Sequence, residues 1–480
     1  METAFSISVK GIRAIEKADI ALKGITVLTG DNGCGKTTIS KLFYSFVKTS
    51  VNFRQIVSDI YSSKILVALS FLEEFFPERE DLADKNFDFD FIQFATYDYV
   101  TAIRKIKRKQ GEIEKYIYKA ILPRVQLLKK LYNEKKYTID IGKFERLNSL
   151  FKRKLKVDVT NKKDVLGLLE GYEQYLTNLA EEITKVIESR NITVFNRKFS
   201  EYFEDDITNW FYTFQEYSEE LINKKTGFVL EQKTFSDTIY IDSPTIFDNV
   251  GTRTRVNGSY FDLSQIMNNT NSIQPKNEAL DSIITDILHG QIIIKDDIFS
   301  HIFIYKSKDG KEIPLSQAAS GVKCFAILER LYSVGLLNPD TLLIIDEPEV
   351  HLHPKWIVEY ARVIISIQKY LGTTILLASH SPDMISALRY IAAKEKCYQS
   401  LFFYHAEKID STNFGKYQFK CLDLDIEEIF ASFSQVGSNP RSRSCCASVL
   451  TIIFRESTTC SGSTSMSISM LLYLLAGFSP

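Results

Sequence analysis

The sequence has few of the features that link a chain covalently or anchor it in a membrane. Its seven cysteines, in 480 residues, form no CxxC pair and no spacing typical of a disulfide framework, which favours free buried thiols. No apolar run approaches the roughly 20 residues that cross a bilayer, and the N-terminus lacks the charged and apolar regions of a signal peptide. We therefore expect a cytoplasmic protein with no membrane partner.

The sequence also lacks a net charge that would indicate a polyanionic partner. It has 59 Lys and Arg against 60 Asp and Glu, so any such partner must be recognised locally. Residues 104–163 hold 20 basic and 6 acidic residues, whereas residues 164–220 hold 4 and 13. We expect solvated helix faces that partly neutralise each other, and the alternative is a surface for nucleic-acid phosphates or an acidic partner.

Apolar residues make up 45% of the sequence, which is enough for a large core and two or three domains. The first 29 residues alternate as strands do. Residues from about 60 to 225 have helical periodicity without a sustained heptad seam, which favours a compact helical insertion over a long coiled-coil arm. After strand-like segments and a predicted hairpin turn at Asp309-Gly310, helices and strands alternate as in a parallel sheet.

One segment has the composition of a phosphate-binding loop. GDNGCGKT, residues 30–37, matches GxxxxGK[ST] at every fixed position, with a strand-like run before it and a helical run after it. In such loops the backbone N–H groups surround phosphate oxygens, Lys36 would reach the β- and γ-phosphates, and Thr37 would offer its hydroxyl to Mg²⁺. The residues expected to contact ATP are Gly30, Asn32, Gly33, Cys34, Gly35, Lys36, Thr37 and Thr38.

The stretch TLLIIDEPEVHLHPKW gathers carboxylates and imidazoles within a few positions. An apolar strand that ends at Asp346 places a carboxylate at the sheet edge, where it can hold Mg²⁺. Glu347 would then face the γ-phosphate and polarise the attacking water. The alternative is a transition-metal centre. Its further ligands would be Glu349, His351 and His353.

Two further motifs complete the pattern. His380 follows the apolar run TTILLAS, so it is expected at a strand end, beside the γ-phosphate. Ser320 and Gly321 begin an apolar helix, where Ser alone would be read as a helix cap. The order in the chain is phosphate loop, long insertion, Ser-Gly helix, Asp-Glu strand and His strand.

These motifs, in this order, resemble the ABC-class ATPase heads of the RecF, SMC and OLD type. The matches are GDNGCGKT for Walker A, ASGVK for the signature, LLIIDEPEVHLHP for Walker B and ASHSP for the switch histidine. DEPExHLHP is especially similar to OLD/RecF-like ATPases, including the ATPase subunits of Septu and PARIS-type phage-defence systems. The resemblance implies an α/β fold: an ABC-type P-loop head with a mixed or parallel sheet, an antiparallel β subdomain and a helical insertion.

The resemblance also implies roles for individual residues. Such heads pair as homodimers, possibly within higher oligomers, and Ser320, Gly321 and the nearby Lys323 would act in trans on ATP held by the other copy. Glu347 would be the catalytic base and His380 the γ-phosphate sensor. The implied Mg²⁺ ligands are Thr37, Asp346 and, at the end of FDFDFIQF, Gln93.

The function implied is Mg²⁺-dependent ATP hydrolysis that controls a nuclease or toxin effector subunit in phage defence. One alternative is a RecF/SMC-like repair ATPase that binds DNA, or RNA, directly, and another is a module that holds ATP without turnover. A built-in nuclease is not expected. OLD nucleases continue into a Toprim domain with clustered acidic ligands, and here the candidates are limited to Glu407, Asp423 and Asp425.

We accordingly divide the chain into four parts. Residues 1–60 and 281–435 are expected to form the two lobes of the ATPase head, and residues 61–280 a mostly helical insertion. Residues 436–480 stand apart, since no Lys occurs after Lys420 and 12 Ser occur within residues 432–469. We expect this tail to be unstructured, and hypothesise that it is translated from a shifted reading frame.

Overall fold

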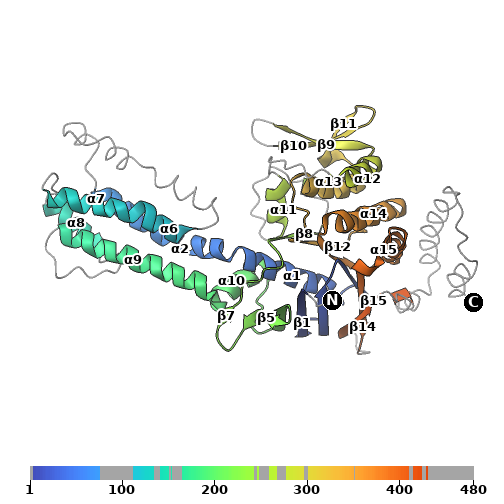
Figure 1. Ribbon diagram of the computed structural model, residues 1–480, viewed down its shortest axis with the longest axis horizontal. Coiled ribbons are helices and arrows are strands. Elements are labelled where there is room, and N and C mark those ends of the chain that lie inside the picture. The colour runs from blue at the N-terminus through green and yellow to red at the C-terminus, as the bar shows by residue number, and fades with distance from the viewer. Residues whose placement is uncertain are drawn as a thin grey trace, which may run out of the picture.

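The computed structural model has a head built around one large sheet and a helical arm that extends from it (Figure 1). The structure describes residues 4–75, 112–134, 141–150, 153, 165–242, 246–247, 259–267, 277–296, 301–350, 352–409, 415–423 and 429–430. Gln93, His351 and the tail 436–480 lie outside these residues. Within them, no helix is long and apolar enough to cross a membrane.

A ten-stranded mixed sheet forms the centre of the head. In spatial order its strands are β5 (Glu219–Glu220), β4 (Phe211–Glu216), β1 (Phe5–Ile12), β2 (Ile15–Leu22), β15 (Tyr417–Asp423), β14 (Leu401–Lys408), β3 (Ile25–Thr29), β13 (Thr374–Ser379), β12 (Thr341–Asp346) and β8 (Asp237–Ile241). From β14 to β8 neighbouring strands are parallel, whereas β5, β4, β1 and β2 are antiparallel. The predicted α/β head with an antiparallel part is confirmed.

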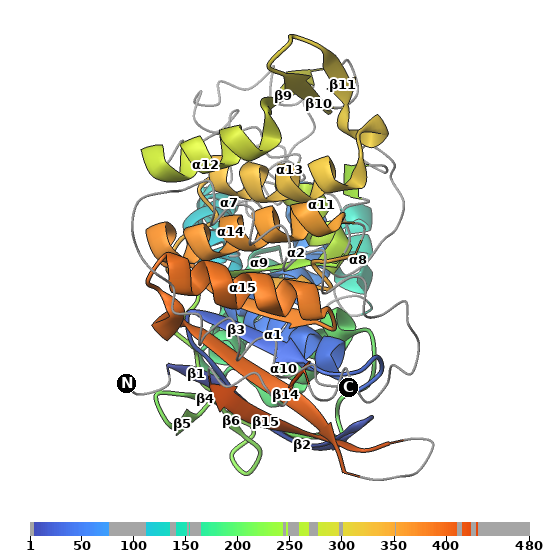
Figure 2. The same cartoon turned by 90° about the vertical axis from the view of Figure 1, so that its right-hand side faces the viewer.

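Helices cover both faces of the parallel part of the sheet (Figure 2). The helices of the head are α1 (Lys36–Val51), α11 (Ser259–Met267), α12 (Glu278–Leu288), α13 (Ser320–Ser333), α14 (Pro354–Leu371) and α15 (Pro382–Lys394), with short turns η4 (Leu315–Gln317) and η5 (Tyr398–Ser400). Leu342 and Ile344 of β12 pack in the core that includes α1, while Leu343 and Ile345 pack in the core of α13, α14 and α15. Because both faces are buried, this strand is apolar throughout.

The arm begins where α1 ends, since α2 follows after Asn52 alone. Its elements are α2 (Phe53–Phe75), α6 (Ile113–Tyr116), the π-helical η1 (Ile117–Ile121), α7 (Leu122–Asn133), α8 (Ile141–Leu150), α9 (Val165–Ser189) and α10 (Ile192–Phe203). The 23-residue α2 and the 25-residue α9 lie side by side and point away from the sheet (Figure 1). The expectation of a compact insertion is wrong, because two long helices that pack along their length form an extended unit.

An ion pair connects the basic segment 104–163 to the acidic segment 164–220, since Lys129 of α7 lies 2.7 Å from Glu173 of α9. A second pair joins α2 to the acidic segment, with Lys64 3.4 Å from Glu182. These pairs agree with helix faces that partly neutralise each other. The basic run at residues 104–109 lies outside the described residues.

Two small sheets complete the fold. One contains β9 (Gly290–Asp296), β10 (His301–Ser307) and β11 (Glu312–Pro314), and the other contains β6 (Ile222–Asn223) and β7 (Phe228–Val229). The predicted hairpin is confirmed, since β10 and β11 are antiparallel neighbours. Within the range 61–280, β4 and β8 belong to the sheet of the head, because they pair with β1 and β12.

Candidate functional site

The glycine-rich loop lies at the carboxyl end of β3 and leads into α1. Gly30, Gly33 and Gly35 have φ values of 138°, 79° and 105°, a region that disfavours any residue with a Cβ. A Cβ on Gly35 would lie 2.5 Å from the Cγ1 atom of Ile15, and one on Gly30 would lie 2.8 Å from the Cβ of Ala406. The strand-loop-helix context predicted for this motif is therefore confirmed, and glycine is required at these positions.

The ammonium of Lys36 is held inside this loop. Its Nζ donates to the carbonyl oxygens of Gly30 and Asp31, each at 2.8 Å, and the side chain is buried. A positive charge fixed among backbone groups at a helix N-terminus is what phosphate oxygens require.

The other loop residues differ in exposure. Asn32 and Thr37 are exposed, whereas Thr38 is buried under the first turn of α1. Cys34 is buried, and burial raises the pKa of its thiol. Cys34 therefore fills space as a neutral thiol and is not poised as a nucleophile.

The strand register brings the predicted site residues to one edge of the sheet. Asp346, the last residue of β12, is paired with Ala378 of β13, and Ser379 of β13 is paired with Thr29 of β3. The phosphate loop, Asp346 and His380 therefore follow three neighbouring parallel strands at the same end. This is the position where open α/β sheets bind ligands.

Asp346 is a buried carboxylate with an unused oxygen. Tyr240 of β8 donates its hydroxyl to Oδ2 at 2.9 Å, while the buried Oδ1 has no hydrogen-bond partner among the described residues. Burial raises the pKa of Asp346, and the nearby hydroxyls of Thr37 and Tyr240 act in the opposite direction. Thr37 and Asp346 fit the oxygen ligands that Mg²⁺ prefers. Gln93, the third expected ligand, lies outside the described residues.

Glu347 adopts a left-handed backbone conformation directly after β12. Its φ is 50°, and the conformation is held by its own N–H, which donates to the carbonyl oxygen of Ala378 at 2.8 Å. The side chain is 42% exposed, and its Oε1 lies 3.6 Å from Nδ1 of His380. The expected base and the expected γ-phosphate sensor are therefore neighbours.

Glu349 is a member of this group that the sequence did not assign to the nucleotide site. Its carboxylate is buried, and Oε1 accepts hydrogen bonds from the Ser379 hydroxyl at 2.9 Å and from the backbone N–H of His380 at 3.0 Å. The same oxygen lies 3.3 Å from Nδ1 of His380. The sequence does indicate Glu349, as an acidic residue two positions after Glu347. We considered this residue only as a ligand of a transition metal.

The transition-metal alternative has no support within the described residues. No group of three or more His, Cys, Asp or Glu side chains there could hold a metal ion. His353 is exposed and begins α14, where its Nδ1 accepts the N–H of Lys355 at 3.3 Å. His351 lies outside the part of the chain that the structure describes.

The signature residues lie at the start of α13, which packs against α11, α12 and β9. A Cβ on Gly321 would lie 2.4 Å from Cε3 of Trp356, so glycine allows α13 to approach α14. Lys323 is buried and donates from Nζ to the carbonyl oxygen of Ser316 at 3.0 Å. The structure therefore gathers the P-loop, Asp346, Glu347 and His380 at one edge of the sheet, and places Ser320 at the start of α13, where Gly321 faces α14.

A sequence profile of the AAA_15 family, AAA ATPase domain, matches residues 5–385. The chain belongs to this family. The match spans the P-loop, the arm, the signature helix, Asp346 and His380, so all of these residues lie within the ATPase domain. No curated protein matches the chain.

Solved structures with similarity to the chain include SMC head domains. The head with an extended coiled coil from Pyrococcus furiosus, bound to the C-terminal domain of ScpA, is 12% identical, with a TM-score of 0.30 over 90% of this chain and 98% of that one. The head with a coiled coil and joint from Pyrococcus yayanosii is 11% identical, with a TM-score of 0.34 over 90% and 99%. The head from Thermotoga maritima is 11% identical, with a TM-score of 0.26 over 45% and 66%.

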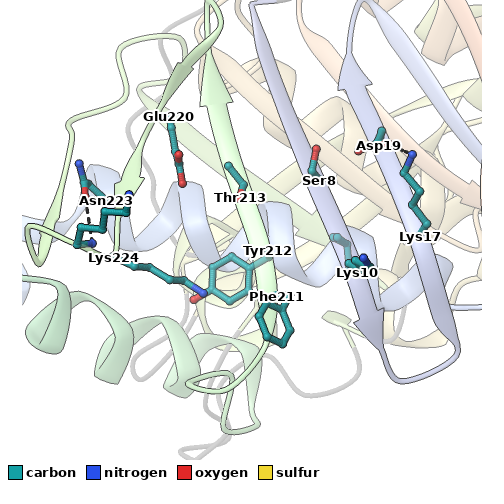
Figure 3. A pocket seen from close by; sticks show the side chains of 12 residues that line it. Ser8, Lys10, Lys17, Asp19, Phe211, Tyr212, Thr213, Glu220, Asn223 and Lys224 are labelled. Carbon is teal, nitrogen blue, oxygen red and sulfur yellow. Dashed lines mark hydrogen bonds and ion pairs between the residues drawn. The ribbon is translucent and has the colours of Figure 1, made fainter.

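A separate hollow of about 590 Å³ lies on the exposed face of the antiparallel strands (Figure 3). Strand pairing places Lys17 opposite Lys10, and Lys10 opposite Phe211. Phe211 is 73% exposed, and Nζ of Lys224 lies 5.9 Å from the centre of its ring. Like charges directly opposite each other destabilise a strand pair. Here Lys17 is compensated in part by Asp19, whose Oδ2 lies 3.1 Å from its Nζ, and Glu220 also lines the hollow.

Proposed function

We propose that this ATPase domain hydrolyses Mg²⁺-ATP between two copies of the chain and uses the closure to control a partner. The observation that carries the proposal is the strand register, which gathers the P-loop, Asp346, Glu347 and His380 at one sheet edge. The resemblance to ABC-class heads supports the second part of the proposal, since it implies that Ser320 and Gly321, at the start of α13, contact ATP held by another copy.

The roles of the residues follow from their positions. Lys36 binds the β- and γ-phosphates. Thr37 and Asp346 would hold Mg²⁺, which would supply neutralisation of phosphate charge. Glu347, half-exposed at the strand end, accepts a proton from the attacking water. His380, 3.6 Å from that carboxylate, contacts the γ-phosphate, and Ser320 with Gly321 contacts it from the other copy.

Light scattering tests the ATP-dependent dimer. Glu347→Gln removes the base but keeps the side-chain shape, so bound ATP should persist and the dimer should accumulate. We expect the measured mass to double when ATP is added to Glu347→Gln and to stay constant for Lys36→Ala, which cannot hold the phosphates. If Glu347→Gln binds ATP and its mass does not change, the two-copy site is wrong. An unchanged hydrolysis rate in that variant would instead favour a module that holds ATP without turnover.

The partner proposed here is a nuclease or toxin subunit in phage defence. The support is the resemblance of DEPEVHLHP to the ATPase subunits of such systems. Co-expression with the product of the neighbouring gene, followed by co-purification with and without ATP, tests this part of the proposal.

Direct binding of single-stranded nucleic acid is a second candidate function. It is favoured by the row of Lys17, Lys10, Phe211 and Lys224 on the face of the sheet (Figure 3). Lysines neutralise backbone phosphates, and an exposed aromatic ring stacks on a base without regard to its identity.

Anisotropy titrations with labelled single strands at several salt concentrations test this candidate. The double substitution Lys10→Gln with Lys17→Gln should weaken binding and lower the salt slope by about 0.7 for each phosphate that the variant no longer neutralises. Lys408→Gln, at the exposed end of β14, is the matched control and should leave the slope unchanged. Equal slopes for the double variant and the wild type would rule out this surface. DNA and RNA strands of one sequence distinguish the two polymers.

A further inference from the structure

Glu349 connects the segment after β12 to the segment after β13. Its Oε1 accepts the hydroxyl of Ser379 and the backbone N–H of His380, while its other oxygen, Oε2, is buried with no hydrogen-bond partner among the described residues. Burying a carboxylate costs free energy unless hydrogen bonds to it offset its desolvation. The two donors come from the residues that set the position of the sensor histidine.

The imidazole of His380 lies beside two carboxylates. Its Nδ1 is 3.3 Å from Oε1 of Glu349 and 3.6 Å from Oε1 of Glu347. Nδ1 is buried and makes no hydrogen bond with the described residues in the present geometry. Hydrogen bonds of this kind are often long in a free enzyme and tighten when substrate binds. Glu349 is the nearer and more deeply buried acceptor, with a side chain 7% exposed against 42% for Glu347.

We propose that Glu349 is the positioning residue of His380. By accepting Nδ1–H it fixes the imidazole tautomer and turns Nε2 toward the γ-phosphate, and it leaves the Glu347 carboxylate free to accept the proton of water. The arrangement is that of a carboxylate that orients a histidine from behind. The expected effect on kcat rests on the proposed ATP hydrolysis, whereas the contact between Glu349 and His380 does not.

Kinetics of Glu349→Gln test the role. The amide oxygen can still accept from Ser379 and from the N–H of His380, so the fold and ATP binding should be kept, but the negative charge is lost. We expect kcat to fall by about 10- to 100-fold, the range seen when an orienting partner is removed, with the Kd for ATP nearly unchanged. Glu395→Gln, which breaks only an exposed pair with Lys369, is the matched control and should keep full kcat.

A double-mutant cycle separates positioning from a structural role. If Glu349 acts through His380, Glu349→Gln should change kcat by less than about twofold in the His380→Ala background. A loss of the same size in both backgrounds would overturn the proposal. Thermal unfolding of each variant identifies a loss that is due to misfolding.

A spectroscopic reading is independent of catalysis. With six histidines in the chain, ¹⁵N-labelled histidine and the His380→Ala variant assign the His380 resonances. We expect neutral His380 to carry its proton on Nδ1 in the wild type and to shift toward the Nε2–H tautomer in Glu349→Gln. An Nε2–H tautomer in the wild type would overturn the inference. If the wild type hydrolyses no ATP, the proposed function is wrong. The tautomer of His380 would still show whether Glu349 accepts its Nδ1–H.

Discussion

At the scale of single residues, the backbone of Glu347 is the least favourable in the site. A left-handed conformation in a residue with a Cβ costs about 1–3 kcal/mol and persists only where surrounding contacts hold it. Here the contacts are the N–H of Glu347 to Ala378 at 2.8 Å and the N–H of Val350 to the Glu347 carbonyl at 3.0 Å. The turn takes the Glu347 side chain out of the alternation of β12 and places it beside His380.

The position of a site residue could be predicted from the sequence wherever an apolar run marked the end of a strand. Asp346 ends one apolar run and His380 follows another, and parallel strands bring such ends to one edge, so their placement at that edge was predictable and agrees with the strand register. Glu349 was not assigned, because a carboxylate near His351 and His353 has the pattern of a metal site as well as that of a buried hydrogen-bond acceptor. Only the burial and partners of its side chain separate the two.

At the scale of elements, apolar periodicity predicted the helices of the arm but not how they pack or that they extend away from the head. The regular apolar spacing of α2 and α9 predicted helices, whereas their side-by-side extension away from the head depends on which faces meet. The membership of β4 and β8 in the large sheet was not predicted, because their partners β1 and β12 are far away in the sequence. Long-range pairing of this kind leaves no local pattern.

Helix α13 contains a half-buried acid that should make the stability of the head depend on pH. Burial raises the pKa of Glu329 from 4.5 to about 7, with a further rise from Asp281 of α12 and an opposing effect of Arg330. The folded state therefore holds this proton more tightly than the unfolded state does. The free energy of unfolding should fall as pH rises from about 4.5 to 7 and then level off, by on the order of 2 kcal/mol.

Urea unfolding of Glu329→Gln between pH 5 and pH 8 measures this contribution. The amide cannot ionise, so the variant should gain stability relative to the wild type as pH rises. Glu278→Gln, at an exposed position in the first turn of α12, should instead follow the wild-type curve. Parallel pH curves for Glu329→Gln and the wild type would contradict the assigned pKa.

At the scale of the whole molecule, the proposed ATP site would take residues from two copies. The P-loop, Asp346, Glu347 and His380 share one sheet edge, and Ser320 begins α13, which packs against α11 and α12. A mixed pair contains one copy with a defective P-loop group and one copy with a defective signature. If ATP lies between two copies, both defects fall in the same one of its two ATP sites, and the other site is intact. Activity can then be recovered by mixing two inactive proteins.

The decisive mixture combines Lys36→Ala with Ser320→Arg, each inactive alone because every site of its homodimer contains a defect. In the mixed pair, one site joins the intact P-loop of the Ser320→Arg copy to the intact signature of the Lys36→Ala copy. Random pairing of equal amounts would make half of the pairs mixed, each with one good site, and would restore about a quarter of the wild-type ATPase activity. Because Lys36→Ala should not pair with itself, mixed pairs are favoured, and the recovery should lie between about a quarter and a half. Lys36→Ala mixed with Glu347→Gln is the control, and it should recover nothing, since both defects belong to the same half. No recovery in the test mixture would place Ser320 and Lys36 in one site of one copy, and recovery in the control would contradict the placement of Lys36 and Glu347 in the same half.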